Sequence, residues 1–159
     1  MRVTDYLANQ TERMAAGLAH FISTTDPEKL NYKPEIPGSM GTRSALQQVS
    51  ECVQVNFGMA KLFRGETLTH PTGGAPEIEF ADTAAAQKAL LESAAEFAAA
   101  IREMDESALE KTYYHPRGEI LGLNMIIMPL RNMSYHAGQI NLIQMLNGDA
   151  EFHTPPNWR

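Results

Sequence analysis

Cysteine is almost absent from this sequence of 159 residues. Cys52 is its one cysteine, so no disulfide can form within the chain, and a zinc or iron–sulfur site built from several thiolates is excluded. Cys52 also lies among apolar residues in a segment of helical pattern, where we expect a small, unreactive hydrophobic side chain. A metal site within one copy of this chain must therefore use nitrogen and oxygen ligands.

Long apolar runs and clusters of positive charge are also missing. No apolar run is long enough to cross a bilayer, and Asp5, Asn9 and Glu12 interrupt the N-terminal segment, so it lacks the apolar core of a signal peptide. Asp and Glu outnumber Lys and Arg by 19 to 13, which gives a formal net charge of -6. Without a local run of Lys or Arg, this charge disfavours nucleic-acid and anionic-membrane partners. We expect a cytoplasmic protein.

What remains is a chain of helical segments. Its length fits one domain with a substantial core, and we find no internal repeat and no credible β-type alternation. Apolar residues recur at helical spacing over about 4–23, 44–64, 82–104 and 121–146. The sequence therefore predicts an all-α fold, a four-helix bundle, with residues 1–159 forming a single domain.

Local signals set the expected helix ends. Thr4 or Asp5 is expected to cap the first helix, Ser44 with Gln47 forms a capping-box pattern for the second, and Asp82 or Thr83 caps the third. Proline and glycine break the linker over 24–43, and 65–81 is a polar loop that could border a site. Residues 105–109 are expected to form a helical turn and 112–114 an extended segment before a turn at 115–118.

The last helix carries polar residues on an apolar face. Pro129 should kink this helix or mark a restart, and Trp158 is expected to pack the tail back on the bundle. The expected core-facing residues of the helix are Met128, Tyr135, Leu142, Ile143 and Leu146. Asn132, His136 and Gln139 follow one another on that face at steps of four and three. Polar groups on a buried stripe need hydrogen-bond partners or a metal.

This helix contains a family-like motif. The segment His136-Ala137-Gly138-Gln139-Ile140, followed by Asn141, an apolar run and Gly148-Asp149, resembles the last helix of the DinB-like (YfiT-like) superfamily of metalloenzymes. The resemblance extends to the Leu30–Pro34 linker and to the Ser44 cap. It implies a four-helix bundle, a homodimer, and a metal held by three histidines, one in the second helix and two in the fourth. Gly138 is expected to permit close helix packing.

Carried onto this sequence, the resemblance implies a metal site of Glu51, Asn132 and His136. His136 matches the final histidine of the family, whereas Asn132 stands where the family has histidine. Glu51 takes the place of the helix-two histidine between Ser44 and Gly65. Glutamate and histidine are ordinary ligands, and asparagine is a weak neutral oxygen donor. Such a set would hold Zn, Ni or Mn, with hard cations tolerated better than by three histidines.

Two functions follow from this cluster. By resemblance, the chain is a metal-dependent hydrolase or a thiol-dependent transferase, with a small-molecule substrate between the second and fourth helices, His136 as ligand or base and Glu51 as ligand or general base. The alternative is a non-catalytic dimeric bundle that binds a small molecule, or serves a structural or stress role, without metal. There, Glu51 accepts a hydrogen bond from His136, Asn132 bridges them, and the carboxylate favours the imidazolium form. We find no Ser/His/Asp or Cys/His arrangement.

Overall fold

The fold is mainly helical, as the sequence predicts. The computed structural model describes residues 1–35, 37–38, 41–67, 75–115 and 118–158, so part of the predicted 65–81 loop and the turn residues 116–117 lie outside the description. Its long helices are α1 (Val3–Thr24), α2 (Ala45–Phe63), α3 (Thr83–Glu103) and α5 (Met128–Leu146). The shorter elements are η1 (Pro27–Lys29), η2 (Glu106–Leu109), β1 (Thr112–His115), β2 (Gly118–Leu121), α4 (Gly122–Ile126) and η3 (Pro156–Trp158).

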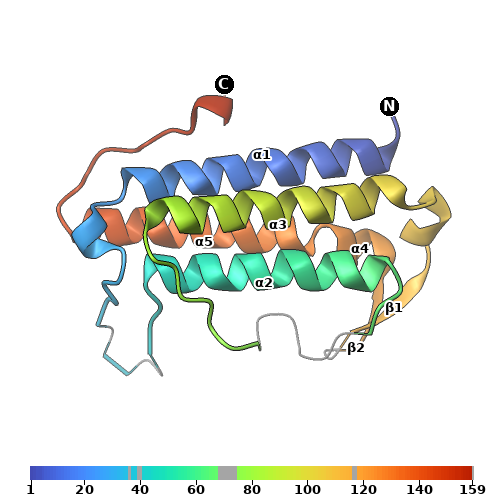
Figure 1. Cartoon of the computed structure of the whole chain (residues 1–159), viewed down its shortest axis with the longest axis horizontal. Coiled ribbons are helices and arrows are strands. Elements are labelled where there is room, and N and C mark those ends of the chain that lie inside the picture. The colour runs from blue at the N-terminus through green and yellow to red at the C-terminus, as the bar shows by residue number, and fades with distance from the viewer. Residues whose placement is uncertain (36, 39–40, 68–74, 116–117, 159) are drawn as a thin grey trace.

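The four long helices lie alongside one another (Figure 1). Helices α2 and α3 run in one direction and α1 and α5 in the other, so the end of α2 and the start of α3 lie at opposite ends of the bundle (Figure 1). Helix α1 packs on α3 and α5, and α2 also packs on α3 and α5. Helices α2 and α5 are therefore antiparallel neighbours, and their side chains can form a common site.

Apolar side chains from all four long helices fill the centre of the bundle. The largest fully buried ones are Leu18, Phe21, Ile22, Val49, Met59, Leu90, Phe97, Ile101, Met125, Ile126, Met133 and Ile140. Small buried residues on α3, such as Ala86, Ala94 and Ala98, allow the neighbouring helices to approach closely. In the described part of the chain, no helix combines the length and the apolar character that a bilayer span requires.

Two of the three predicted caps are confirmed. The Gln47 N–H donates to Ser44 Oγ at 3.3 Å and the Ser44 N–H donates to Gln47 Oε1 at 3.1 Å, while Ala85 N–H donates to Asp82 Oδ1 at 2.7 Å. The prediction for α1 was wrong. That helix begins at Val3, whose N–H donates to Glu106 Oε1 at 2.7 Å, so a distant residue supplies the cap that the local sequence lacks.

The segment before the last helix corrects the prediction of a fold without β-structure. Strand β1 confirms the expected extended segment, but it pairs with β2 in an antiparallel hairpin whose register joins Tyr113 to Ile120. The fourth predicted helix is divided into α4 and α5 at Ile127, and Pro129 lies in the first turn of α5. Proline is tolerated there because a first-turn N–H has no intrahelical partner, so the predicted restart is confirmed.

The predicted core face of α5 was partly wrong. Tyr135, Leu142 and Leu146 are 66%, 51% and 55% exposed, and of the five residues assigned to that face only Ile143 is buried. The buried stripe contains Met133, Ala137 and Ile140, and also His136 and Gln144. Apolar residues occur on both faces of this helix, so helical spacing alone did not show which face packs against the bundle and which face stays exposed to solvent.

The C-terminal end of α5 and the tail beyond it pack against α1. Gln144 Nε2 lies 3.0 Å from the Phe21 carbonyl oxygen and 3.1 Å from Thr25 Oγ1, which satisfies acceptors at the C-terminal end of α1. Beyond α5 the tail runs back along α1 (Figure 1), and the Trp158 ring centroid lies 5.9 Å from that of Phe21. A Cβ atom at Gly17 would be 2.8 Å from Trp158 Nε1. The expected return of Trp158 to the bundle is confirmed.

Candidate functional site

The three residues of the expected site lie together between α2 and α5. Glu51 is in the first half of α2, and Asn132 and His136 are one turn apart on α5. Asn132 Nδ2 donates to Glu51 Oε1 at 3.3 Å. His136 Nε2 lies 3.7 Å from Glu51 Oε2, which is too long for a hydrogen bond. The structure therefore brings the three predicted residues together, but the hydrogen bond expected between Glu51 and His136 is not formed.

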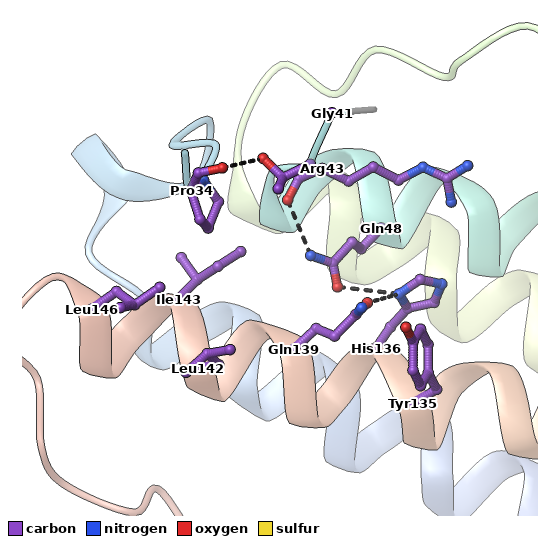
Figure 2. A pocket seen from close by; sticks show the side chains of 11 residues that line it. Pro34, Gly41, Arg43, Gln48, Tyr135, His136, Gln139, Leu142, Ile143 and Leu146 are labelled. Atoms are coloured by element: carbon purple, nitrogen blue, oxygen red, sulfur yellow. Dashed lines mark hydrogen bonds between the residues drawn. The ribbon is translucent and has the colours of Figure 1, made fainter. Parts of the chain in front are cut away.

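Two glutamine side chains fix the His136 ring (Figure 2). Nδ1 lies 3.1 Å from Gln48 Oε1 and 2.8 Å from Gln139 Oε1. The Gln48 amide is oriented by its own Nε2, which donates to the Arg43 carbonyl oxygen at 3.2 Å. Because both neighbours of Nδ1 are acceptors, Nδ1 carries the hydrogen, and in the neutral imidazole Nε2 presents a lone pair toward Glu51.

The ring is held neutral by its surroundings. His136 is 3% exposed, and burial lowers its pKa, as does the positive charge of Arg43 to a smaller extent, while the bond to Gln139 acts in the opposite direction. The expected imidazolium form is therefore wrong. The carboxylate of Glu51 already has a cationic partner, so it does not offset the cost of burying a charged imidazole.

That cationic partner is Arg43, which sequence analysis missed. Arg43 Nη1 forms an ion pair with Glu51 Oε2, and the two side chains are 54% and 21% exposed. Arg43 stands just before the Ser44 cap, in a linker rich in proline and glycine. A single arginine in such a linker carries no sequence signal, because its approach to Glu51 depends on how the linker folds over the start of α2.

The cluster contains buried acceptor atoms without hydrogen-bond partners. Among the described residues, five buried side-chain atoms lack such a partner, and three of them are Glu51 Oε2, Asn132 Oδ1 and His136 Nε2. Burying polar atoms in this state is costly. Arg43 neutralises Glu51 but leaves the asparagine oxygen and the imidazole lone pair unpartnered. Such a cluster is incomplete without a cation or a donor.

The donor set fits a divalent cation. It offers one imidazole nitrogen, one carboxylate and one amide oxygen, which are ordinary ligand types for such a cation, and His136 Nε2 lies 3.7 Å from Glu51 Oε2. Within the residues that the structure describes, no group of three or more His, Cys, Asp and Glu gathers. The set therefore depends on Asn132. Cys52 is buried in the same helix as Glu51, and burial raises the pKa of its thiol, so it is a poor nucleophile.

A cavity opens beside His136 and has two different ends (Figure 2). Its volume is about 480 Å³, which is within the range of small-molecule sites, roughly 300–1,000 Å³. Gln48, Gln139 and His136 line its polar end, and Leu142 and Leu146 belong to the apolar end. Leu142 and Leu146, which sequence analysis assigned to the core of the bundle, thus line an open cavity.

A second, smaller cavity lies on the Glu51 side of Arg43. It has a volume of about 200 Å³ and is lined by polar residues that include Gln47, Ser50, Gln54 and Glu77. Arg43 lines both cavities. Its side chain therefore separates a polar space next to the carboxylate from an amphipathic space next to the imidazole.

Comparison with known proteins adds no relative, because no protein-family model and no curated protein matches this chain. The resemblance around His136 to Gln139 remains a prediction, and the function is argued from the chemistry of the site.

Proposed function

We propose that this chain is a DinB-like metal-dependent enzyme, a hydrolase or a thiol-dependent transferase, in which Glu51, Asn132 and His136 hold a divalent cation such as Zn²⁺, Ni²⁺ or Mn²⁺. The observation that carries the proposal is a cluster in which Asn132 Oδ1 and His136 Nε2 are buried without hydrogen-bond partners, and Nε2 lies 3.7 Å from Glu51 Oε2. A bound cation would supply charge stabilisation and would activate a water or a thiol as a nucleophile at neutral pH.

The surrounding residues have distinct parts in this proposal. Gln48 and Gln139 accept the Nδ1 hydrogen of His136, which orients Nε2 as a ligand, a common arrangement for metal-binding histidine. Asn132 donates from Nδ2 to Glu51 Oε1, which leaves its own Oδ1 as an acceptor. The cavity beside His136 would hold the organic substrate. Arg43 competes with a cation for Glu51, so cation binding requires the ion pair to open.

Metal content tests the proposal. The protein is purified without an affinity tag, loaded with Zn²⁺, Ni²⁺ or Mn²⁺ and analysed by elemental mass spectrometry. We expect one equivalent in the natural chain and a loss in both Glu51→Ala and His136→Ala. The control is His153→Ala, because His153 lies in the tail and pairs with Asp149 at 2.7 Å. Asn132→His should tighten zinc binding, since imidazole replaces an amide oxygen. No metal under any loading condition would overturn the proposal.

A second candidate is a non-catalytic dimeric bundle that binds a small molecule without metal. It is favoured by the ion pair between Arg43 and Glu51, which satisfies the carboxylate without a metal. It predicts that ligands enter the cavity with the same affinity in the presence and absence of a chelator, and that no metal accompanies the purified protein.

A further inference from the structure

We infer that the cavity beside His136 binds a small amphipathic carboxylate, and that Arg43 is the cation that receives the carboxylate group. This inference names the substrate class of the proposed site, and to that extent it rests on the proposed function. Its evidence comes from the two ends of the cavity and from the position of Arg43 between two cavities.

The first observation is the division of the cavity into an apolar and a polar end. In Figure 2, Leu142, Leu146 and Pro34 lie at one end, and Gln48, Gln139 and His136 at the other. Leu142 and Leu146 are 51% and 55% exposed, so an apolar chain placed along them would remove apolar surface from water. The ligand that matches this space has an apolar tail and a polar head.

The second observation is the charge at the polar end. Among the described residues that line this cavity, Arg43 is the only Asp, Glu, Lys or Arg. Guanidinium recognises carboxylate with two parallel hydrogen bonds, and Arg43 already engages a carboxylate, that of Glu51. The matching head group is therefore an anion, and a carboxylate is the group with which Arg43 already pairs, in Glu51.

The third observation is that Arg43 can serve two partners. It lines both cavities, and its side chain is 54% exposed, so the guanidinium can turn about its flexible stem without opening the core. In Figure 2 the side chain extends away from Pro34 and Leu146. Glu51 therefore acts as an internal competitor for the ligand, and loss of the Glu51 charge should strengthen ligand binding.

Calorimetric titration with octanoate tests the inference, and the uncharged octanamide serves as the matched probe. We expect octanoate to bind about tenfold more tightly than octanamide, a difference of about 1.4 kcal/mol. Arg43→Gln should remove this preference, and Arg43→Lys should keep part of it. Glu51→Gln should strengthen octanoate binding by about threefold or more, because the guanidinium is released.

Arg131→Gln is the control for charge. Arg131 is an exposed arginine of the same helix as His136, and its Nη2 donates to the Asn124 carbonyl oxygen at 3.4 Å. This variant loses the same charge as Arg43→Gln and should keep the affinity for octanoate. Circular dichroism checks that each variant is folded. Leu146→Glu provides a second test, since a negative charge at the apolar end should weaken octanoate binding more than octanamide binding.

Three results would overturn the inference. They are equal affinities for octanoate and octanamide, unchanged octanoate binding in Arg43→Gln, and no saturable octanoate binding in either the natural chain or Glu51→Gln. Failure of the proposed metal site gives a different pattern. In that case no metal is retained, yet octanoate still binds and binds more tightly in Glu51→Gln. Stoichiometric metal without octanoate binding would remove this inference and leave the proposed metal site.

Discussion

At the scale of the residue, His136 has a position that could be predicted from the sequence and a charge that could not. Its place beside Glu51 and Asn132 was predictable from helical spacing and a family-like motif. Its charge was not predictable, because that depends on burial and on Arg43, which reaches Glu51 from a linker. A lone arginine next to a proline- and glycine-rich stretch has no pattern that sequence reasoning can use.

We expect His136 to stay neutral in cation-free protein below the pH at which an ordinary histidine titrates. Its folded pKa lies below the reference value of 6.5, whereas the unfolded chain binds a proton near that value. The unfolded state therefore holds more protons in the interval between the two pKa values, so the free energy of unfolding falls as the pH falls through it. Nitrogen NMR chemical shifts measure the protonation directly.

In urea unfolding at several pH values, His136→Gln should lose part of the pH dependence between neutral and mildly acidic conditions. An imidazolium signal from His136 near neutral pH would contradict the expectation.

At the scale of the element, features that depend on residues close in the sequence were predictable, and features that depend on tertiary contacts were not. The Ser44 capping box involves residues three apart, so its pattern was sufficient. The start of α1 depends on Glu106, which is a hundred residues away. The hairpin of β1 and β2 was missed because each strand has only four residues. Such short strands are marginal without support from neighbouring elements, here η2 and α4.

Two helical glycines, Gly122 of α4 and Gly138 of α5, should respond in opposite ways to alanine. A Cβ at Gly122 would lie 2.2 Å from the Ala108 carbonyl oxygen, a backbone atom, whereas a Cβ at Gly138 meets nothing within 4 Å. The expectation that Gly138 permits close packing was therefore wrong. Gly122→Ala should lower the free energy of unfolding by about 1–3 kcal/mol, and Gly138→Ala should raise it by about 0.5–1 kcal/mol.

Urea unfolding followed by circular dichroism measures both changes. The two variants serve as controls for each other, because each adds one methyl group to a helix. A neutral Gly122→Ala would mean that α4 can move away from η2 at little cost.

At the scale of the whole molecule, the sequence predicted the number of long helices but not their directions in space. The periodicity of each segment is local, whereas the parallel directions of α2 and α3 (Figure 1) depend on how each helix packs in the bundle. The candidate site likewise combines a local feature that was predictable and a tertiary one that was not. Spacing placed Asn132 and His136 on one helix, and only the packing of α2 on α5 brings Glu51 to them.

We expect the chain to form a homodimer in solution, as the family resemblance implies. Apart from the leucines that line the cavity, helix α5 keeps Tyr135 and Met145 more than half exposed, and exposed apolar surface of this kind is typical of a contact with a partner. Sedimentation equilibrium should give twice the chain mass of 17.6 kDa. Met145→Glu should weaken the dimer, and Lys88→Glu on α3, with a largely exposed side chain, is the control. A monomer at all concentrations would contradict the expectation.

The tail that packs against α1 gives the molecule a natural optical reporter. Trp158 is the only tryptophan in the sequence, and it stacks at an angle against Phe21 while contacting Gly17. Its fluorescence therefore monitors the attachment of the last residues to the first helix and not the integrity of the whole bundle. If the tail detaches first, the emission changes at a lower denaturant concentration than the circular dichroism of the helices. In this protein, a fluorescence midpoint alone would then understate the stability of the bundle.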